Sequence, residues 1–202
     1  MNESIAALSG HTAGLLRLGL PQQRADELLP QVLAEFQSVY PEVCVQAVSL
    51  PNDELERKLL GSELDMALVS GEAENEKLEY QLIASDEVVL PAGRKTTPTE
   101  SLPFTRSYDE LLARAGLSPF VVLRTDDSQC AKRVCAACSL VMLCPFITLL
   151  SDTPAMQQLS HYRLSDSLYT SLYMACPKDM PLTPYAQTLY TMMSNRFRAM
   201  TA

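Results

Sequence analysis

The sequence predicts an α/β fold in which parallel strands alternate with helices that cover the sheet. Three segments have the composition of strands, at residues 15–20, 43–50 and 64–69, and two segments with apolar residues at helical spacing lie between them. The third strand segment is nearly all apolar, as a parallel strand covered on both faces should be. The order strand, helix, strand, helix, strand is typical of an open parallel sheet.

The first strand and helix have clear ends. The strand at residues 15–20 ends at Pro21, where the chain enters a loop. The helix that follows ends before Pro41, because proline disfavours a helical conformation in the residue before it. The apolar stripe of this helix comprises Leu28, Leu29, Val32, Leu33 and Phe36.

The second helix has polar residues at its start and a glycine at its end. Asn52 and Asp53 are predicted to cap it, and Gly61 to end it. After the third strand, the chain is predicted to form two short strands and then a proline-rich and hydroxyl-rich exit from the first lobe, at residues 80–84, 87–90 and 91–103.

The second half of the chain repeats the order of strands and capped helices. Thr125-Asp-Asp-Ser128 can cap a helix that carries several cysteines. The other elements predicted here are a helix at 107–115, strands at 119–124 and 146–150, a helix opened by Ser151-Asp-Thr-Pro154, a strand at 168–175 and a helix at 184–200.

The composition is that of an ordinary globular protein, with 202 residues, 47% of them hydrophobic and 20% charged. A net charge of −8 opposes contact with a phosphate backbone, so these residues are not expected to bind nucleic acid themselves. No apolar run approaches the roughly 18 residues of a membrane span, and no secretory signal is visible. We therefore expect a cytoplasmic protein with no membrane contact, whose six cysteines are free thiols.

Four segments carry a family resemblance: Gly14-Leu-Leu-Arg-Leu-Gly19, Leu28-Leu-Pro30, Phe36-Gln-Ser-Val-Tyr-Pro41 and Leu59-Leu-Gly-Ser-Glu-Leu-Asp-Met-Ala-Leu-Val69. In order and spacing they resemble the effector-binding domain of LysR-type transcriptional regulators. The match is specific over residues 14–90 and looser beyond, although residues 182–187 also resemble the closing segment of that family.

The resemblance implies two Rossmann-like lobes joined by two crossing strands, as in type 2 periplasmic binding proteins, with a small-molecule effector in the cleft between them. It also implies a homodimer, and a tetramer in the full-length protein, in which DNA is bound only by an N-terminal domain that is not among these residues. Residues 1–13 would end a linker helix, residues 14–92 and 176–202 would form the first lobe, and residues 93–175 a shortened second lobe.

The second lobe departs from the family pattern. Before the strand at 168–175 the family usually has a longer segment, which includes a strand reading Gly-Val-Ala-Leu-Leu-Pro. One register leaves that strand out of this chain, and a second register matches it to Leu140-Val-Met-Leu-Cys-Pro145. Both registers stay open at this point.

Ligands of open parallel sheets bind beyond the carboxyl ends of the strands, where helix N-termini offer free N–H groups. Three such ends can face one cleft, and the resembling family uses these positions for effectors, often carboxylates or other small acids. Asp127, Ser128 and Thr153 equally fit plain helix caps, and Arg24 equally fits a solvated position. The candidate effector-binding residues are Gln22, Gln23, Arg24, Thr125, Asp127, Ser128, Ser151 and Thr153.

The cysteines between residues 130 and 144 allow three interpretations. Cys135 and Cys138 form one close pair, but Cys130 and Cys144 do not form the second pair that a zinc site would need. Cys130 lies near a helix N-terminus, where the dipole stabilises a thiolate, and its spacing to Cys138 resembles the cysteine pair of the family's peroxide sensor. Alternatively, Cys135, Cys138 and Cys144 are buried apolar residues of a core-facing helix.

No phosphate-binding loop or metal-hydrolase motif is present, and neither His11 nor His161 belongs to a recognisable triad. We therefore expect no enzyme and no cofactor. Three functions stay open: a ligand-sensing regulatory domain, a thiol-based redox sensor that acts through Cys130, and a stand-alone solute-binding protein. The free thiols and the lack of a visible signal peptide count against the third.

Overall fold

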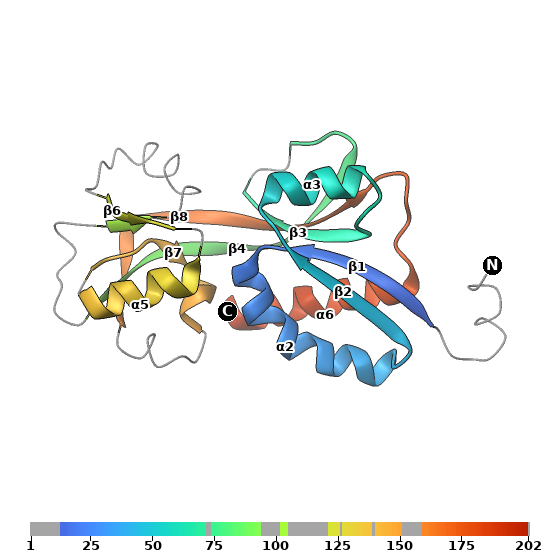
Figure 1. Ribbon diagram of the computed structural model, residues 1–202, viewed down its shortest axis with the longest axis horizontal. Helices are drawn as coiled ribbons and strands as arrows, with labels where there is room; N and C mark the ends of the chain where they lie inside the picture. The colour runs from blue at the N-terminus through green and yellow to red at the C-terminus, as the bar shows by residue number, and fades with distance from the viewer. Residues whose placement is uncertain are drawn as a thin grey trace. The chain divides into compact units, whose positions relative to one another are not determined.

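The computed structural model describes residues 13–71, 74–93, 102–104, 121–125, 127–138, 140–150 and 159–201. The chain divides into two compact units, one of Met1–Ser85 with Ser171–Ala202 and one of Asp86–Thr170. It passes from one unit to the other twice, within strand β4 (Leu78–Gly93) and within strand β8 (Leu159–Pro177). Each unit therefore contains part of both strands (Figure 1).

The first unit is built on a parallel sheet. Its central strand is β1 (Gly14–Leu20), with β2 (Val43–Ser49) on one side and β3 (Met66–Ser70) on the other, both parallel to β1. β8 pairs with β3 in the antiparallel direction, and the full strand order is β2-β1-β3-β8-β4-β7. The predicted alternation of strands and helices is confirmed in this unit.

Helices cover both faces of this sheet: α2 (Gln22–Val39) and α6 (Pro184–Thr201) one face, and α3 (Asn52–Leu60) the other. Alternate residues of β1 face opposite sides, so Gly14 and Gly19 report on different faces. A Cβ atom at Gly14 would lie 2.9 Å from the ring of Tyr185 in α6, and a Cβ atom at Gly19 would lie 2.5 Å from Leu55 in α3. On the first face α2 lies beside α6 (Figure 1). The buried β1 leucines of this face are Leu16, Leu18 and Leu20.

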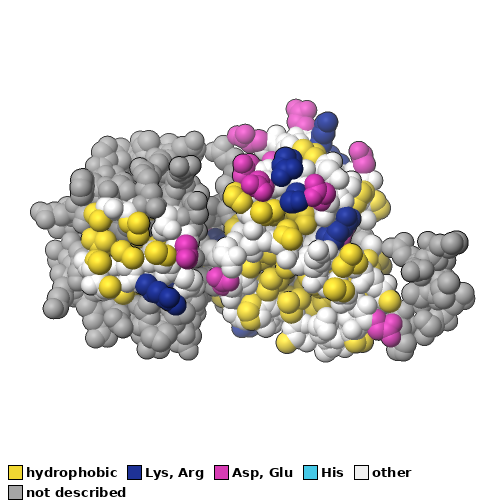
Figure 2. Space-filling view, in the orientation of Figure 1, with side chains coloured by type: hydrophobic (Ala, Val, Ile, Leu, Met, Phe, Trp, Pro, Cys, Tyr) yellow, Lys and Arg dark blue, Asp and Glu magenta, His cyan; other side chains and the backbone are white. Residues whose placement is uncertain are grey.

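Charged side chains gather over α3, as Figure 2 shows. Asp53 and Glu54 lie in its first turn and Arg57 and Lys58 in its last turn, an arrangement that the helix dipole favours. The inward face of the same helix buries leucines, so its charged face is the solvated one. No helix within the described parts of the chain is long and apolar enough to cross a membrane.

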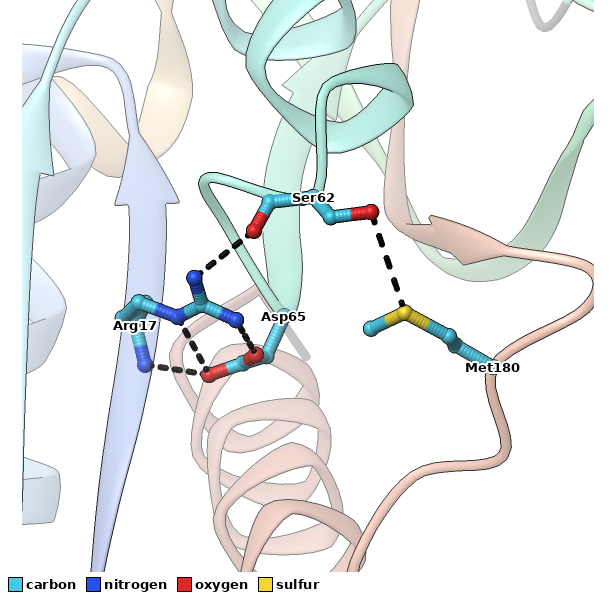
Figure 3. Close-up of polar contacts among 4 residues, drawn as sticks. All are labelled: Arg17, Ser62, Asp65 and Met180. Carbon is cyan, nitrogen blue, oxygen red and sulfur yellow. Dashed lines mark hydrogen bonds and ion pairs between the residues drawn. The ribbon is translucent and has the colours of Figure 1, made fainter.

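An ion pair ties β1 to the turn that leads into β3 (Figure 3). Arg17 Nη2 donates to Asp65 Oδ1 at 2.6 Å, and the backbone N–H of Arg17 donates to Asp65 Oδ2 at 2.7 Å. Arg17 Nη1 donates to the carbonyl oxygen of Ser62 at 2.7 Å, and Ser62 has a φ of +55°, which is uncommon for residues other than glycine. The hydrogen bond that Arg17 donates to the Asp65 carboxylate raises the pKa of the Arg17 guanidinium, and these contacts hold the turn against β1.

The second unit contains two parallel strands and a short helix, followed by a segment that lies antiparallel to β4. In that segment Val141 bridges to Ala92, and β7 (Cys144–Pro145) pairs with Val88 and Val89. These are the residues that one of the two registers matches to the family's Gly-Val-Ala-Leu-Leu-Pro strand, and the choice between the registers stays a prediction. The other elements are β5 (Leu102–Phe104), β6 (Val121–Arg124), α5 (Ser128–Cys138) and the 3-10 helix η2 (Phe146–Leu150).

Several local predictions are wrong. β4 is one continuous strand instead of two short ones, and it includes the residues 91–93 that were expected to leave the first lobe. Residues 146–150 form η2 instead of a strand, and Ile147 N–H in this helix donates to the buried Asp86 at 3.3 Å. β8 begins at Leu159, nine residues before the expected start. The helices expected at 107–115 and from Ser151 fall outside the described residues.

The predicted caps of α3 are half right. Gly61 ends the helix, and its N–H donates to the carbonyl oxygen of Arg57. At the other end the N-cap is Pro51, with no side-chain cap, so neither Asn52 nor Asp53 takes the expected place. The side chain of Asn52 is used elsewhere, in a contact with the end of β3.

Candidate functional site

The first unit has a reversal in strand order at the carboxyl end of β1. The chain leaves β1 through α2 to reach β2, and then returns through α3 to reach β3 on the other side of β1. Ligands of open α/β sheets bind where the strand order reverses in this way. Two described segments of this unit meet that point, residues 21–24 at the start of α2 and residues 70–71 at the end of β3.

The start of α2 offers N–H groups without a side-chain cap. Pro21 is the N-cap, in an extended conformation with no capping side chain, and the first turn holds no acidic residue. The N–H groups of Arg24 and Ala25 both donate to the carbonyl oxygen of Pro21. The first N–H groups of a helix have no acceptor inside it and carry the positive end of its dipole. This end of α2 is therefore suited to an acceptor oxygen from outside the helix.

The three predicted site residues in this turn point to different surroundings. Gln22 is exposed, and its amide donates to Asp26 at 2.9 Å. The Nε2 of Gln23 is buried and has no hydrogen-bond acceptor among the described residues. Arg24 is 2% exposed, with its guanidinium 5.4 Å from the ring centroid of Phe197 in α6. The solvated alternative for Arg24 is therefore wrong, because the residue is buried where α2 packs on α6.

The end of β3 is held by a side chain that sequence reasoning assigned to a cap. The amide of Asn52 donates to the carbonyl oxygen of Ser70 and accepts from the Ser70 N–H at 3.3 Å. The next residue, Gly71, has a φ of +106°, which strains residues with a side chain, and a Cβ atom there would meet nothing within 4 Å. Ser70 and Gly71 thus join the candidate site. The glycine after an apolar strand was the only sequence signal for them.

In the second unit, the predicted residues at the start of α5 make a local cap. Asp127 Oδ1 accepts from the N–H groups of Gln129 and Cys130 at 2.9 and 3.0 Å, and Thr125 Oγ1 accepts from Asp127 N–H at 3.1 Å. The capping interpretation is confirmed for Asp127. Ser128 begins α5, but its side chain, like Ser151 and Thr153 as a whole, lies outside the described residues.

The six cysteines are free thiols with two kinds of surroundings. Cys44, Cys130 and Cys138 are exposed, whereas Cys135, Cys144 and Cys176 are buried. The expectation that Cys138 is buried is wrong, and Cys144 belongs to β7 instead of the helix. Within the described parts of the chain, no cluster of side chains could hold a metal ion.

The redox interpretation finds no support in this arrangement. Cys130 and Cys138 lie near opposite ends of an intact helix, about 12 Å apart at 1.5 Å per residue, whereas a disulfide needs Cα atoms within roughly 7 Å. Lys132, two residues after Cys130, is fully buried.

A family model decides what kind of domain this is. Residues 9–198 match the model of the LysR substrate-binding domain. The chain belongs to this family. Among curated relatives of this LysR substrate-binding domain, the HTH-type transcriptional regulator GltR of Bacillus subtilis (strain 168) is 29% identical over 120 residues. That alignment covers 58% of this chain and 40% of GltR, so the chain spans less than half of that relative.

Solved structures show the same fold. The CcmR regulatory domain of Synechocystis PCC6803, in complex with 2-PG, superposes with a TM-score of 0.80 at 20% identity, covering 94% of this chain and 100% of that chain. The BenM effector-binding domain with its effector benzoate gives a TM-score of 0.77 at 15% identity, covering 94% and 95%. The predicted fold class is confirmed: this LysR substrate-binding domain has the type 2 periplasmic-binding-protein-like fold.

Proposed function

We propose that this LysR substrate-binding domain senses a small-molecule effector in a cleft between its lobes and responds by changing the arrangement of a homodimer, which forms a tetramer in the full-length protein. DNA would be bound only through an N-terminal domain outside these residues. The match to a transcriptional regulator favours regulation over catalysis and over stand-alone solute binding. The observation that carries the proposal is the unpaired Gln23 amide at the N-terminus of α2.

The Gln23 amide needs an acceptor. A buried donor without a partner costs about 1–3 kcal/mol, and an oxygen atom of a ligand would remove that cost once the side chain turns toward it. The positive end of α2, an 18-residue helix, favours an acceptor that carries negative charge. These two features support an effector with a carboxylate or another anionic oxygen. The solved BenM domain holds benzoate, which is a carboxylate.

The first prediction concerns Gln23. Leucine at this position keeps much of the side-chain volume and removes the amide. Gln23→Leu should therefore weaken the binding of the effector by about 10-fold to 100-fold, which corresponds to one hydrogen bond to a charged group. The thermal midpoint should be measured against a panel of small carboxylates for the original chain, followed by titration of any acid that raises it. Without ligand, the variant should be at least as stable as the original chain, because an unsatisfied donor is gone.

The matched control is Gln22→Leu, one residue earlier on the same turn. The Gln22 amide is exposed and bonded to Asp26, so this variant should keep the full response to the acid. If the acid raises the thermal midpoint equally in the two variants and the original chain, the effector does not bind at the start of α2. If no acid or other small molecule shifts the original chain, the sensing function itself is contradicted.

The second prediction is a dimer in solution. β2 lies at the edge of the sheet, where one side of its backbone has no neighbour among the described strands. Such an edge favours pairing with another chain. Sedimentation at micromolar concentration should therefore give a species of twice the chain mass of 22.3 kDa. A single monomeric species over the whole concentration range would contradict the proposed dimer response.

A further inference from the structure

Two cysteines of α5 lie close together without being bonded. Cys135 and Cys138 are three residues apart on the helix, so their Cα atoms are separated by about 5 Å. Cys135 is a buried residue and Cys138 is an exposed one. Burial is the main cause that raises the pKa of the Cys135 thiol, and the neighbouring Cys138 raises it slightly further.

The Cys135 thiol sits against the backbone pairing that joins the segment after α5 to β4. Its Sγ lies 2.9 Å from the carbonyl oxygen of Leu140 and 3.6 Å from that of Pro91. The same two oxygens accept the N–H groups of Gly93 and Met142 at 3.0 and 2.9 Å. Burial, above all, raises the pKa of Cys135 to about 11, so at neutral pH this group is a protonated thiol that donates to a carbonyl oxygen.

These surroundings select the chemistry that such a pair can perform. A zinc ion binds thiolates and takes four ligands, and a buried thiol that holds its proton is a poor ligand for it. A trivalent arsenical that carries hydroxyl groups has no such requirement, because each hydroxyl leaves as water with the thiol proton. Two neighbouring thiols match two hydroxyl groups on one arsenic atom.

We propose that Cys135 and Cys138 form a dithiol site for monosubstituted trivalent arsenicals of the type R–As(OH)2. Two S–As bonds form and two As–O bonds break, and the two thiol protons leave with the hydroxyl groups as two molecules of water. No oxidation state changes. The exposed Cys138 makes the first bond, after which Cys135 turns from the Leu140 carbonyl to make the second. The organic group stays on the solvent side, where Cys138 is exposed. This site is independent of the proposed effector site.

Phenylarsine oxide, which hydrates to such a dihydroxide, tests the site on the full chain. Intact mass spectrometry should show one arsenical per chain with the loss of two titratable thiols, and peptide mapping should place both on residues 135 and 138. A dithiol such as 2,3-dimercaptopropanol should remove the adduct, and an equal concentration of 2-mercaptoethanol should not. Cys138→Ser should bind at least about 100-fold more weakly, because the second bond is then lost.

Cys130→Ser is the matched control, since Cys130 is an exposed thiol on the same helix. It should bind the arsenical like the original chain. Cys138 is exposed, so its replacement is not expected to prevent folding, and far-ultraviolet circular dichroism checks this for both variants. Unchanged binding by Cys138→Ser, or an adduct that maps to Cys44 or Cys130, would overturn the proposal.

Discussion

Replacing Phe197 with alanine is expected to lower the free energy of unfolding by about 3–5 kcal/mol. The ring is fully buried in α6 and lies against Arg24, which is itself buried at the start of α2. Removing the ring leaves a cavity between the two helices and exposes the Arg24 guanidinium to that cavity instead of to an aromatic face. Urea unfolding followed by circular dichroism measures the loss as a lower transition midpoint.

Two variants separate the ring from other features of this interface. Phe197→Leu keeps most of the apolar volume and should lose less than half as much stability as the alanine variant. Arg196→Ala removes the neighbouring side chain, whose Nε donates to Gln31 of α2 at the exposed side of the interface. An exposed contact of this kind contributes roughly 1 kcal/mol or less. A similar loss for Arg196→Ala and Phe197→Ala would contradict the central role given to the ring.

Gly19→Ala is expected to cost about 1–3 kcal/mol, although it adds a single methyl group. A Cβ atom there would lie 2.5 Å from Leu55 Cδ2 and 2.6 Å from Leu64 Cδ1, closer than carbon atoms can approach. Both leucines belong to the buried cluster between α3 and the sheet, so they can move only by disturbing their neighbours. The same urea experiment measures this loss.

Gly61→Ala is the matched control, because an added Cβ atom has room at this glycine. Its φ is −82°, and the nearest atom to an added Cβ is a backbone oxygen at 3.4 Å. Alanine is compatible with this backbone and reduces the freedom of the unfolded chain, so the change should be neutral or stabilising by about 0.4–1 kcal/mol. Equal losses at residues 19 and 61 would show that the tight contact at Gly19 is not the cause.

The first unit was predictable because its signals are local. The nearly all-apolar strand at 64–69, the stop at Pro41 and the glycine at residue 61 each depend on neighbouring residues. The second unit was predicted less well because distant contacts decide it. Ser85 and Asp86 interrupt an apolar pattern and suggest a loop, yet Asp86 is buried in β4, where it accepts an N–H from η2. A short apolar run such as residues 146–150 fits a strand and a helix equally well.

The candidate site was predictable in its position but not in the roles of its residues. The N-terminus of a helix after a buried strand indicates a ligand edge in any open sheet. Whether Gln23 or Arg24 is available there depends on Phe197, far away in the sequence, whose ring receives the Arg24 guanidinium. The position of Asn52 after Pro51 suggested a cap, because the carbonyl of Ser70 that it contacts could not be placed from the sequence.

The first unit is completed by the last part of the chain. β8 pairs with β3 through residues 172–175, and α6 covers the buried leucines of β1 together with α2. During synthesis, Leu16, Leu18 and Leu20 therefore leave the ribosome long before α6 exists to cover them. The second unit is one contiguous stretch, Asp86–Thr170, so all of its residues are synthesised before α6. Although chains generally fold from the N-terminus as they are made, here the unit that comes second in the sequence is the first that can be complete on the ribosome.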